Sequence, residues 1–343
     1  MISVLVVDDS ALVRSMLSEI INDHPLLTLV GTAPDAYVAK RMVNEFKPDV
    51  ITLDIEMPKV SGLVFLDRLM KARPTPVVMF SSLTEYGAAA TIEALELGAV
   101  DFIAKPKLNI ANKVSSFSDE LTEKILQASQ VRIDKRPNLQ TSAELPLVKY
   151  TGNNLIIALG ASTGGTEAIR KVLVDLPARF PAIVISQHMP AGFTASFARR
   201  LDKLCKVHVK EAEHDEQVTA GNVYIAPGDY HLELVRSADG YRISLSQAEK
   251  VNNHRPSVDV MFASVAKQLG ANAAGVILTG MGKDGAVGLK AMQASGAQTM
   301  AQSKESCVIF GMPKEAIKCD AVNETLDISE ISSALANWVG RKA

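Results

Sequence analysis

Short apolar runs alternate with longer amphipathic stretches over the first hundred residues. A buried strand of a parallel sheet appears as a continuous apolar run rich in Val, Ile and Leu, whereas a covering helix places apolar residues three or four positions apart. The pattern therefore predicts a parallel sheet wrapped by helices. Its five strands are expected at Ile2–Val7, Leu27–Gly31, Val50–Ile55, Val77–Ser81 and Asp101–Ala104.

The pattern weakens after this first series. Ser, Lys, Gln and Asn accumulate between residues 109 and 152, where Pro137 and Pro146 interrupt the chain and only Phe117–Val131 keeps a helical stripe. We therefore expect a core at residues 1–107, a terminal helix that extends the domain to about residue 131, and a linker at residues 132–152.

A second strand–helix series follows the linker and predicts a three-layer α/β domain over residues 153–343. Helices become sparse around residues 207–246, where His231–Val235 and Tyr241–Leu245 suggest an antiparallel ribbon at the sheet edge. The strands of the parallel sheet are expected at Leu155–Leu159, Ala182–Ile185, Asn222–Ala226, Val276–Thr279 and Gln298–Ala301.

Composition supports two domains and narrows the possible partners. A chain of 343 residues with 47% hydrophobic content exceeds the usual size of a single core. A formal charge of −2 gives no overall positive field for nucleic acid, so no nucleic-acid partner is expected. The three cysteines lack metal-site spacing, and neither a signal peptide nor a membrane-spanning run is evident. We expect a cytoplasmic protein that does not insert into membranes.

Three carboxylates follow strands of the first predicted sheet. Asp8 and Asp9 come after the first strand and Asp54 closes the third, so a sheet of order 2-1-3-4-5 brings them together at its carboxyl edge. Such a cluster suits a hard divalent cation, with Mg²⁺ favoured because it leaves positions open for phosphate oxygens. Lys105 follows the fifth strand and could pair with Asp54 or an added phosphoryl group, while Ser81 would supply a hydroxyl. Any one of these acidic residues alone could be ordinary loop solvation.

Residues 1–107 resemble the receiver domain of two-component response regulators, a flavodoxin-like (CheY-like) fold. The matching segments are Val7–Ser10, Asp54–Pro58, Ser61-Gly62, Met79–Ser82 and Phe102–Pro106. The resemblance implies that Asp54 accepts the phosphoryl group from a chemotaxis histidine kinase and that Ser81, Phe102 and Lys105 respond to it. It also implies a metal site made by Asp8, Asp9, Asp54 and the backbone carbonyl of Glu56.

A candidate nucleophile lies in the second domain. Its first strand runs into Gly160-Ala-Ser162-Thr-Gly164-Gly165, which has the form of a nucleophile elbow before a helix. Alone the motif is weak, because a glycine-rich turn of this kind can equally cradle phosphate. However, no lysine follows the glycines as a P-loop requires, and Ser162 occupies the middle glycine position of a dinucleotide motif.

Partners for Ser162 are expected at neighbouring strand ends. His188 follows the next strand and is the expected base, whereas His24 lies in the first domain and His208 and His214 flank a charged segment that looks solvated. His231 and His254 could line a cleft, but a surface or capping role is favoured for each. Asp284 lies in a glycine-rich turn after a third strand and would orient His188, although an Asx turn or a helix cap would also explain it. Gly280 and Gly282 would let the backbone N–H of Met281 point at an oxyanion.

Residues 153–338 resemble the catalytic domain of the CheB family of chemotaxis protein-glutamate methylesterases. The resemblance rests on Gly160–Gly165, Ser186–Pro190, Arg255–Asp259 and Leu278–Gly285. It implies hydrolysis of glutamate methyl esters on methyl-accepting chemotaxis receptors, deamidation of certain glutamines, and no cofactor in the esterase site. Thr163 is expected to support His188. Arg255 is expected either to bind an acidic receptor segment or to brace its own loop.

Two other functions are the alternatives to ester hydrolysis. A response regulator with a DNA-binding output would need a basic recognition helix, which residues 153–343 do not show. A nucleotide-binding α/β domain would use the Ser162 loop for phosphate. The domain order also suggests that the unphosphorylated receiver covers part of the esterase crevice and that phosphorylation of Asp54 relieves this block.

Overall fold

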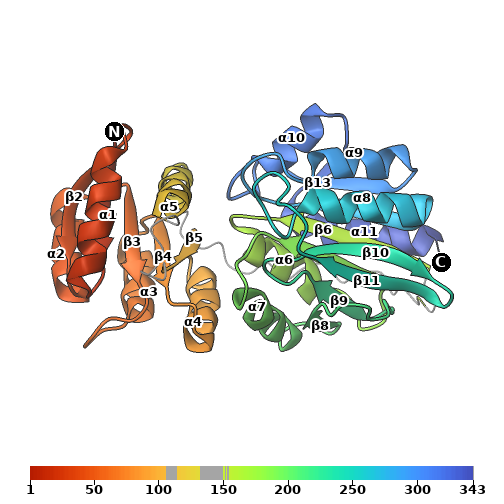
Figure 1. Cartoon of the computed structure of the whole chain (residues 1–343), viewed down its shortest axis with the longest axis horizontal. Coiled ribbons are helices and arrows are strands. Elements are labelled where there is room, and N and C mark those ends of the chain that lie inside the picture. The colour runs from red at the N-terminus through yellow and green to blue at the C-terminus, as the bar shows by residue number, and fades with distance from the viewer. Residues whose placement is uncertain (106–113, 132–149, 151, 153, 343) are drawn as a thin grey trace. The chain divides into compact units, whose positions relative to one another are not determined.

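The computed structural model describes residues 1–105, 114–131, 150, 152 and 154–342 and divides the chain into two compact units, Met1–Leu139 and Gln140–Ala343. Most of the predicted linker, residues 132–152, lies outside the described residues. Each unit has its own parallel sheet with helices packed against it (Figure 1). The predicted α/β class with two sheets is therefore confirmed.

The first unit is a five-stranded parallel sheet in the order β2-β1-β3-β4-β5. This is the predicted order, and its direction reverses between β1 and β3, where parallel strands leave a crevice at their carboxyl ends. The strands are β1 Ile2–Val7, β2 Leu27–Ala33, β3 Val50–Asp54, β4 Val77–Ser81 and β5 Asp101–Ala104, and the helices are α1 Ala11–Asp23, α2 Ala36–Phe46, α3 Gly62–Ala72, α4 Glu85–Glu96 and α5 Val114–Ala128.

Local sequence explains why the helices of this unit begin where they do. Ser10 caps α1 by accepting a hydrogen bond from the backbone N–H of Val13 at 3.4 Å, and Asp35 caps α2 in the same way. The terminal helix is confirmed as α5, and Phe117 packs edge-on against Phe80 of β4 with ring centroids 5.8 Å apart. Caps and an apolar face thus fix each helix on the sheet.

The second unit is built on a seven-stranded parallel sheet in the order β14-β13-β12-β6-β7-β9-β8. Its strands are β6 Ile156–Ala161, β7 Ala182–Gln187, β8 His208–Glu211, β9 Asn222–Ile225, β12 Ala273–Ile277, β13 Gln298–Gln302 and β14 Glu324–Leu326, and its helices are α6 Gly165–Val174, α7 Phe193–Asp202, α8 Val258–Leu269, α9 Ala286–Ala294, α10 Met312–Lys318 and α11 Ile328–Lys342, with a 3₁₀ turn at Gly270–Asn272. All residues of β6, β7 and β12 are buried, as expected for central strands covered on both faces.

Alternate residues of the central strands point to opposite faces of this sheet. Ile156 and Ala158 of β6 belong to the hydrophobic cluster that contains Phe262 of α8 and Leu289 of α9. On α6, the carbonyl of Val172 accepts a hydrogen bond from the Ser332 hydroxyl of α11, which joins these two helices. Two separate sets of helices therefore enclose the sheet and leave its strand ends open for a site.

The predicted antiparallel ribbon is present as β10 His231–Ser237 and β11 Gly240–Ser246. The two strands form a sheet of their own, separate from the seven-stranded parallel sheet. Leu232, Leu234 and Ile243 point into the core shared with α8, and the backbone N–H of Leu234 donates to Ser264 of that helix. Alternation along the strands predicted one buried face but not the partner that covers it.

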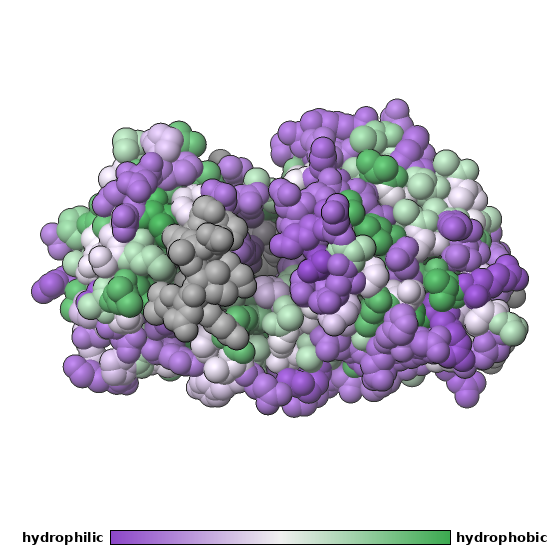
Figure 2. Space-filling model, in the orientation of Figure 1, coloured by the Kyte–Doolittle hydropathy of each residue, from purple (hydrophilic) through white to green (hydrophobic). Residues whose placement is uncertain are grey.

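No helix within the described parts of the chain is both long enough and apolar enough to cross a bilayer. On the second unit, hydrophilic residues cover much of the face drawn in Figure 2.

Candidate functional site

The three predicted catalytic residues follow three adjacent strands of the second sheet. β6 lies between β7 and β12, and Ala161 at the end of β6 is in register with Gln187 at the end of β7. The backbone N–H of His188 donates to the Ala161 carbonyl at 3.1 Å, and that of Ser162 donates to the Thr279 carbonyl at 3.0 Å. Parallel strands end at one edge, so the topology brings the Ser162 and His188 segments and the loop leading to Asp284 together.

Ser162 lies in a tight turn between β6 and α6. The Ser162 carbonyl accepts hydrogen bonds from the backbone N–H of Gly165 at 2.7 Å and from the side-chain amide of Gln187 at 2.9 Å. Gly164 caps α6 with a φ of 76°, a conformation that favours glycine. A Cβ on Gly280 would lie 2.7 Å from the Ser162 Cβ, so only glycine permits this close approach. Ser162 is therefore held at a helix N-terminus, where negative charge is favoured.

His188 and Asp284 form a hydrogen-bonded pair that is almost fully buried. The Nε2 atom of His188 lies 2.8 Å from Oδ2 of Asp284, and the two side chains are 6% and 1% exposed. The Nδ1 atom of His188 is buried and has no hydrogen-bond partner among the described residues. An ionised Asp284 can only accept a hydrogen bond, so the proton belongs on Nε2 and Nδ1 keeps a free lone pair.

Asp284 is held by hydrogen bonds from residues on either side of the α8 N-terminus as well as from His188. Burial alone would raise the pKa of Asp284. The hydrogen bond from His188 and its electrostatic attraction lower that pKa, and the hydrogen bonds from Asn252 and Val258 lower it further. Together they outweigh burial and hold the pKa well below its usual range. The other donors are the Asn252 amide at 2.9 Å, the Ser257 hydroxyl at 2.8 Å, and the backbone N–H groups of Val258 at 2.7 Å and Asp259 at 3.2 Å.

The predicted oxyanion and support residues lie close to Ser162 in the chain or across the strand ends. Met281 is partly exposed in the loop that follows Gly280, whose carbonyl accepts backbone hydrogen bonds from Gly311 and Met312. Thr163 is buried, and its carbonyl accepts from the Thr279 hydroxyl at 3.0 Å. The roles of Met281 as an oxyanion donor and of Thr163 as a support for His188 stay predictions.

Two other histidines contact His188 or the start of α8, and Arg255 takes one of its two expected roles. His254 does not have the surface or capping role favoured from sequence: its ring stacks on His188 with centroids 3.6 Å apart and an interplanar angle of 12°. His231 is 1% exposed and joins Glu249 to Ser257 through its two ring nitrogens. Arg255 bonds Asp229 and the carbonyls of Gln247 and Ala248, so it braces its own loop.

Sequence reasoning missed several polar residues that support the site. Asn252, Gln187 and Thr279 all bond a predicted catalytic residue or the turn that carries one. Gln187 and Thr279 are polar residues at the ends of apolar strands, a position that could have marked them. Asparagine tolerates the left-handed backbone that Asn252 and Asn253 adopt, but no pattern in the sequence indicated that this turn faces Asp284.

The first unit contains a second cluster of charged residues. Asp8, Asp9 and Asp54 each offer a carboxylate oxygen, and these oxygens lie within 4.8 Å of one another. The ammonium of Lys105 lies 2.8 Å from Oδ2 of Asp54 and 3.2 Å from Oδ2 of Asp8. The structure thus brings together four residues that the sequence placed at one crevice.

Burial dominates the electrostatics of this acidic cluster. It raises the pKa of Asp54 to about 6, against the opposing hydrogen bond from Lys105. It raises the pKa of Asp8 as well, and although burial by itself would lower the pKa of Lys105, the two ion pairs raise it. Oδ2 of Asp8 and Oδ2 of Asp54 are buried and, apart from the Lys105 ammonium, have no polar partner among the described residues, which fits residues that can hold a hard metal cation.

The raised pKa of Asp54 predicts that Asp54→Asn stabilises the first unit at neutral pH in the presence of a chelator. The folded-state pKa of about 6 exceeds the ordinary aspartate value of 3.8, so ionisation of Asp54 disfavours folding at higher pH. The gain in the free energy of unfolding should be absent below about pH 4 and grow between about pH 4 and pH 6. Above about pH 6 it should reach about 3 kcal/mol. Thermal unfolding of the full chain measures it. The control is Asp67→Asn, which removes a carboxylate that pairs with Lys71 at the surface. A gain that does not depend on pH would contradict the prediction.

The remaining receiver residues lie in and beside this crevice. Ser81 is buried and bonds the Gly87 carbonyl and the Thr91 hydroxyl of α4, while Phe102 is buried on β5 with the Lys124 ammonium 5.7 Å from its ring centroid. Glu56 donates its backbone N–H to Asp54 at 3.2 Å. The switch roles of Ser81 and Phe102, and the metal bond from the Glu56 carbonyl, stay predictions.

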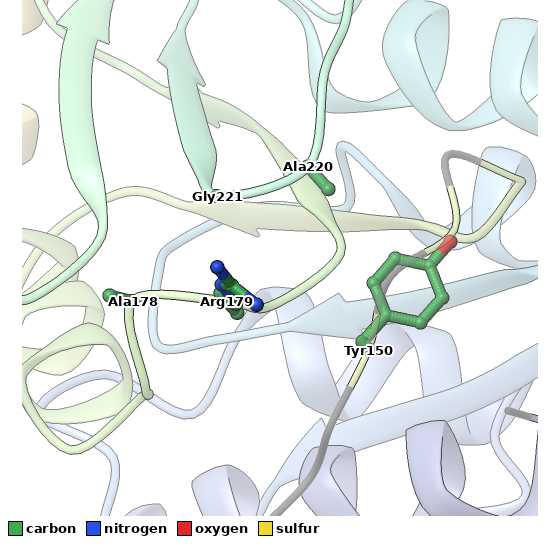
Figure 3. A pocket seen from close by; sticks show the side chains of 5 residues that line it. All are labelled: Tyr150, Ala178, Arg179, Ala220 and Gly221. Atoms are coloured by element: carbon green, nitrogen blue, oxygen red, sulfur yellow. The ribbon is translucent and has the colours of Figure 1, made fainter.

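A small pocket of about 280 Å³ lies at the opposite edge of the second sheet (Figure 3). It is lined by residues that precede β6, β7 and β9, namely Tyr150, Ala178, Arg179, Ala220 and Gly221. The hydroxyl of Tyr150 is already bonded to Asn154 and to the backbone N–H of Leu155. This pocket therefore adds nothing to the catalytic set at the carboxyl edge.

Comparisons with known proteins cover both units. Residues 157–335 match the family CheB methylesterase, and residues 4–113 match the family response regulator receiver domain. The protein-glutamate methylesterase/protein-glutamine glutaminase of Salmonella typhimurium is 53% identical over 334 residues, covering 97% of this chain and 96% of that protein. A protein of the same description, numbered 2, from Shewanella oneidensis is 54% identical over 343 residues and 98% of both chains.

A solved structure agrees with these sequence matches. The crystal structure of the CheB methylesterase catalytic domain from Thermotoga maritima is 41% identical and has a TM-score of 0.53, covering 54% of this chain and 99% of that chain. The chain belongs to the CheB family of protein-glutamate methylesterases/protein-glutamine glutaminases, in which a receiver domain regulates the methylesterase domain.

Proposed function

We propose that this chain hydrolyses glutamate methyl esters on methyl-accepting chemotaxis receptors, and deamidates certain of their glutamines, with Ser162, His188 and Asp284 as the catalytic triad. The observation that supports this proposal best is the buried His188–Asp284 pair next to the Ser162 turn. The pair leaves Nδ1 of His188 as the nitrogen able to take a proton from Ser162. The names of the relatives supply the glutamate ester and glutamine chemistry.

In the first half of the reaction, Ser162 Oγ attacks the ester carbonyl carbon while its proton passes to Nδ1 of His188. The negative charge that develops on the carbonyl oxygen is stabilised by backbone N–H groups, with Met281 the proposed donor. Collapse of this intermediate breaks the bond to the methoxy oxygen, which takes the proton from His188 and leaves as methanol. The glutamyl group remains attached to Ser162 as an ester.

In the second half, water attacks the ester of Ser162 and gives one proton to His188. The bond to Ser162 Oγ breaks, the proton returns to that oxygen, and a glutamate carboxyl group is released. With a glutamine substrate the same steps release ammonia in place of methanol. Asp284 stays ionised throughout, since its low pKa suits the role of holding Nε2–H and stabilising the imidazolium. We propose no cofactor for this site.

The first unit is proposed to be the regulatory receiver, with Asp54 as phosphoryl acceptor and a chemotaxis histidine kinase as donor. Asp8, Asp9, Asp54 and the Glu56 carbonyl would hold Mg²⁺, which supplies charge neutralisation for phosphoryl transfer when it is bound. Lys105 already pairs with Asp54 and is placed to stabilise an added phosphoryl group. Ser81 and Phe102 would then change their contacts.

The proposed domain division is a receiver core at residues 1–107 that extends to about residue 131, a linker at 132–152 and a catalytic domain at 153–343. We place the protein in the cytoplasm, where receptor helices and kinase would both be accessible. We further propose that phosphorylation of Asp54 raises the esterase activity of the second domain by weakening an inhibitory contact with the receiver.

A methanol-release assay on a methyl-esterified cytoplasmic receptor fragment tests this function. The wild-type chain is expected to release methanol, and a small phosphodonor with Mg²⁺ is expected to raise the rate. Asp54→Asn should remove the increase and keep the basal rate, whereas Asp67→Asn, at a partly exposed position on α3, should keep both. Absence of methanol from a protein whose Ser162 is still labelled by a fluorophosphonate would contradict the proposed substrate but not the serine chemistry. Equal rates with and without phosphodonor would contradict the regulation.

A further inference from the structure

The segment Val251–His254 is a tight turn next to the triad. The backbone N–H of His254 donates to the Val251 carbonyl at 2.9 Å, and that of Val251 donates to the His254 carbonyl at 3.2 Å. The two central residues, Asn252 and Asn253, have φ angles of 50° and 66°. Left-handed backbone at both central positions defines a type I′ turn, and asparagine tolerates this conformation better than most residues. The turn therefore has a fixed geometry set by its own sequence.

Two side chains of this turn reach two members of the triad. Asn252 uses its amide to donate to Oδ1 of Asp284 at 2.9 Å and to Oδ2 of Asp259 at 2.8 Å. His254 lays its ring over that of His188 with centroids 3.6 Å apart and planes only 12° from parallel. One short turn thus contacts the carboxylate that orients the base and the base itself.

The ring of His188 needs a second constraint. Its bond to Asp284 fixes the position of Nε2, but a single hydrogen bond leaves the ring able to rock about the N–H···O direction. Rocking would move Nδ1, the atom proposed to take the proton of Ser162. A flat partner on one face of the imidazole restricts this motion and excludes water from that face.

We infer that His254 is a positioning residue that fixes the ring plane of His188, and that the Val251–His254 turn is the element that holds the base in line with Ser162. His254 presents the face of its ring to His188, and a stacked ring is not placed to exchange a proton through either nitrogen of the base. This inference rests on the proposed function, because it assumes that His188 activates Ser162.

Variants of His254 in the full-length chain test whether the flat face of its ring, and not its nitrogen atoms or its bulk, supports catalysis. His254→Phe keeps a flat ring and should retain catalysis within about threefold, whereas His254→Leu and His254→Gln remove the ring and should lower kcat about tenfold with little change in KM. The rate at which a fluorophosphonate labels Ser162 should fall by a similar factor. His208→Leu makes the same change at an exposed histidine of this unit and serves as the control.

The labelling rate separates failure of this inference from failure of the proposed substrate, since it needs no receptor. Equal labelling of wild type, His254→Leu and His254→Gln would overturn the positioning role. Equal loss in His254→Phe and His254→Leu would overturn it too, because a ring nitrogen and not the ring face would then matter. If wild-type protein is labelled but releases no methanol, the positioning role of His254 is still supported. Only the receptor methyl ester is then excluded as the substrate.

Discussion

Replacing Ser162 with alanine is expected to abolish methanol release and labelling by a fluorophosphonate, while the thermal unfolding of the chain stays close to that of wild type. Without the hydroxyl no covalent intermediate can form, and the loss of kcat should be about 10⁴- to 10⁶-fold. The fold should survive because the hydrogen bonds that shape the turn are made by the Ser162 backbone, to Thr279, Gly165 and Gln187. Methanol release under saturating substrate measures the effect.

A matched control is Ser237→Ala, which removes an exposed hydroxyl from the ribbon and should change neither readout. Binding of methylated receptor should persist in Ser162→Ala, because the substitution removes chemistry and not the surface around it. Methanol release at an undiminished rate in Ser162→Ala would exclude the serine mechanism altogether.

Replacing Asp284 with asparagine is expected to cost both activity and stability. Oδ1 of Asp284 accepts from Asn252, Ser257 and Asp259, and Oδ2 accepts from Val258 and His188, so either placement of an amide NH₂ faces at least two donors. The variant would also favour the wrong tautomer of His188. We expect kcat to fall about 10³- to 10⁴-fold and the free energy of unfolding to fall by about 2–4 kcal/mol.

The stability loss in Asp284→Asn should depend on pH. Because the folded-state pKa of Asp284 is depressed, its contribution is present above the unfolded-state pKa of about 4 and is lost as pH falls through the lower folded-state value. Chemical unfolding at pH 7 and pH 3 should therefore show a smaller difference from wild type at the lower pH. The control is Asp320→Asn, an exposed position with a φ of 51° that asparagine accepts. Full activity in Asp284→Asn would remove Asp284 from the triad.

The strand ends account for most of what the sequence could predict. Apolar runs located the central strands to within a few residues, and once the strands are parallel, Ser162 and His188 must meet at one edge. Asp8, Asp54 and Lys105 meet in the first unit for the same reason. Residue type and strand position are local properties, so a single sequence is enough to recognise them.

Contacts between distant loops account for what the sequence could not predict. The Asn252–Asp284 bond and the stacking of His254 on His188 depend on how a loop before α8 folds over the sheet edge. The path of this loop leaves no periodic pattern in the sequence. A histidine in a polar loop, with no predicted partner, is usually a surface residue. The same limit applies to the antiparallel ribbon. Alternating apolar and polar residues showed that β10 has a buried face, but they did not show that α8 covers it.

The central position of β6 links catalysis to the folding of the second unit. Its neighbour on one side, β12, comes from far along the chain, and the bond between Thr279 and Thr163 joins residues 116 positions apart. Parallel pairing over such a separation has a high contact order and forms slowly, whereas β6 and β7 are joined through a single helix. During refolding, we therefore expect esterase activity to return after most secondary structure, so that the rate of ester hydrolysis reports when the last strands of the sheet have joined.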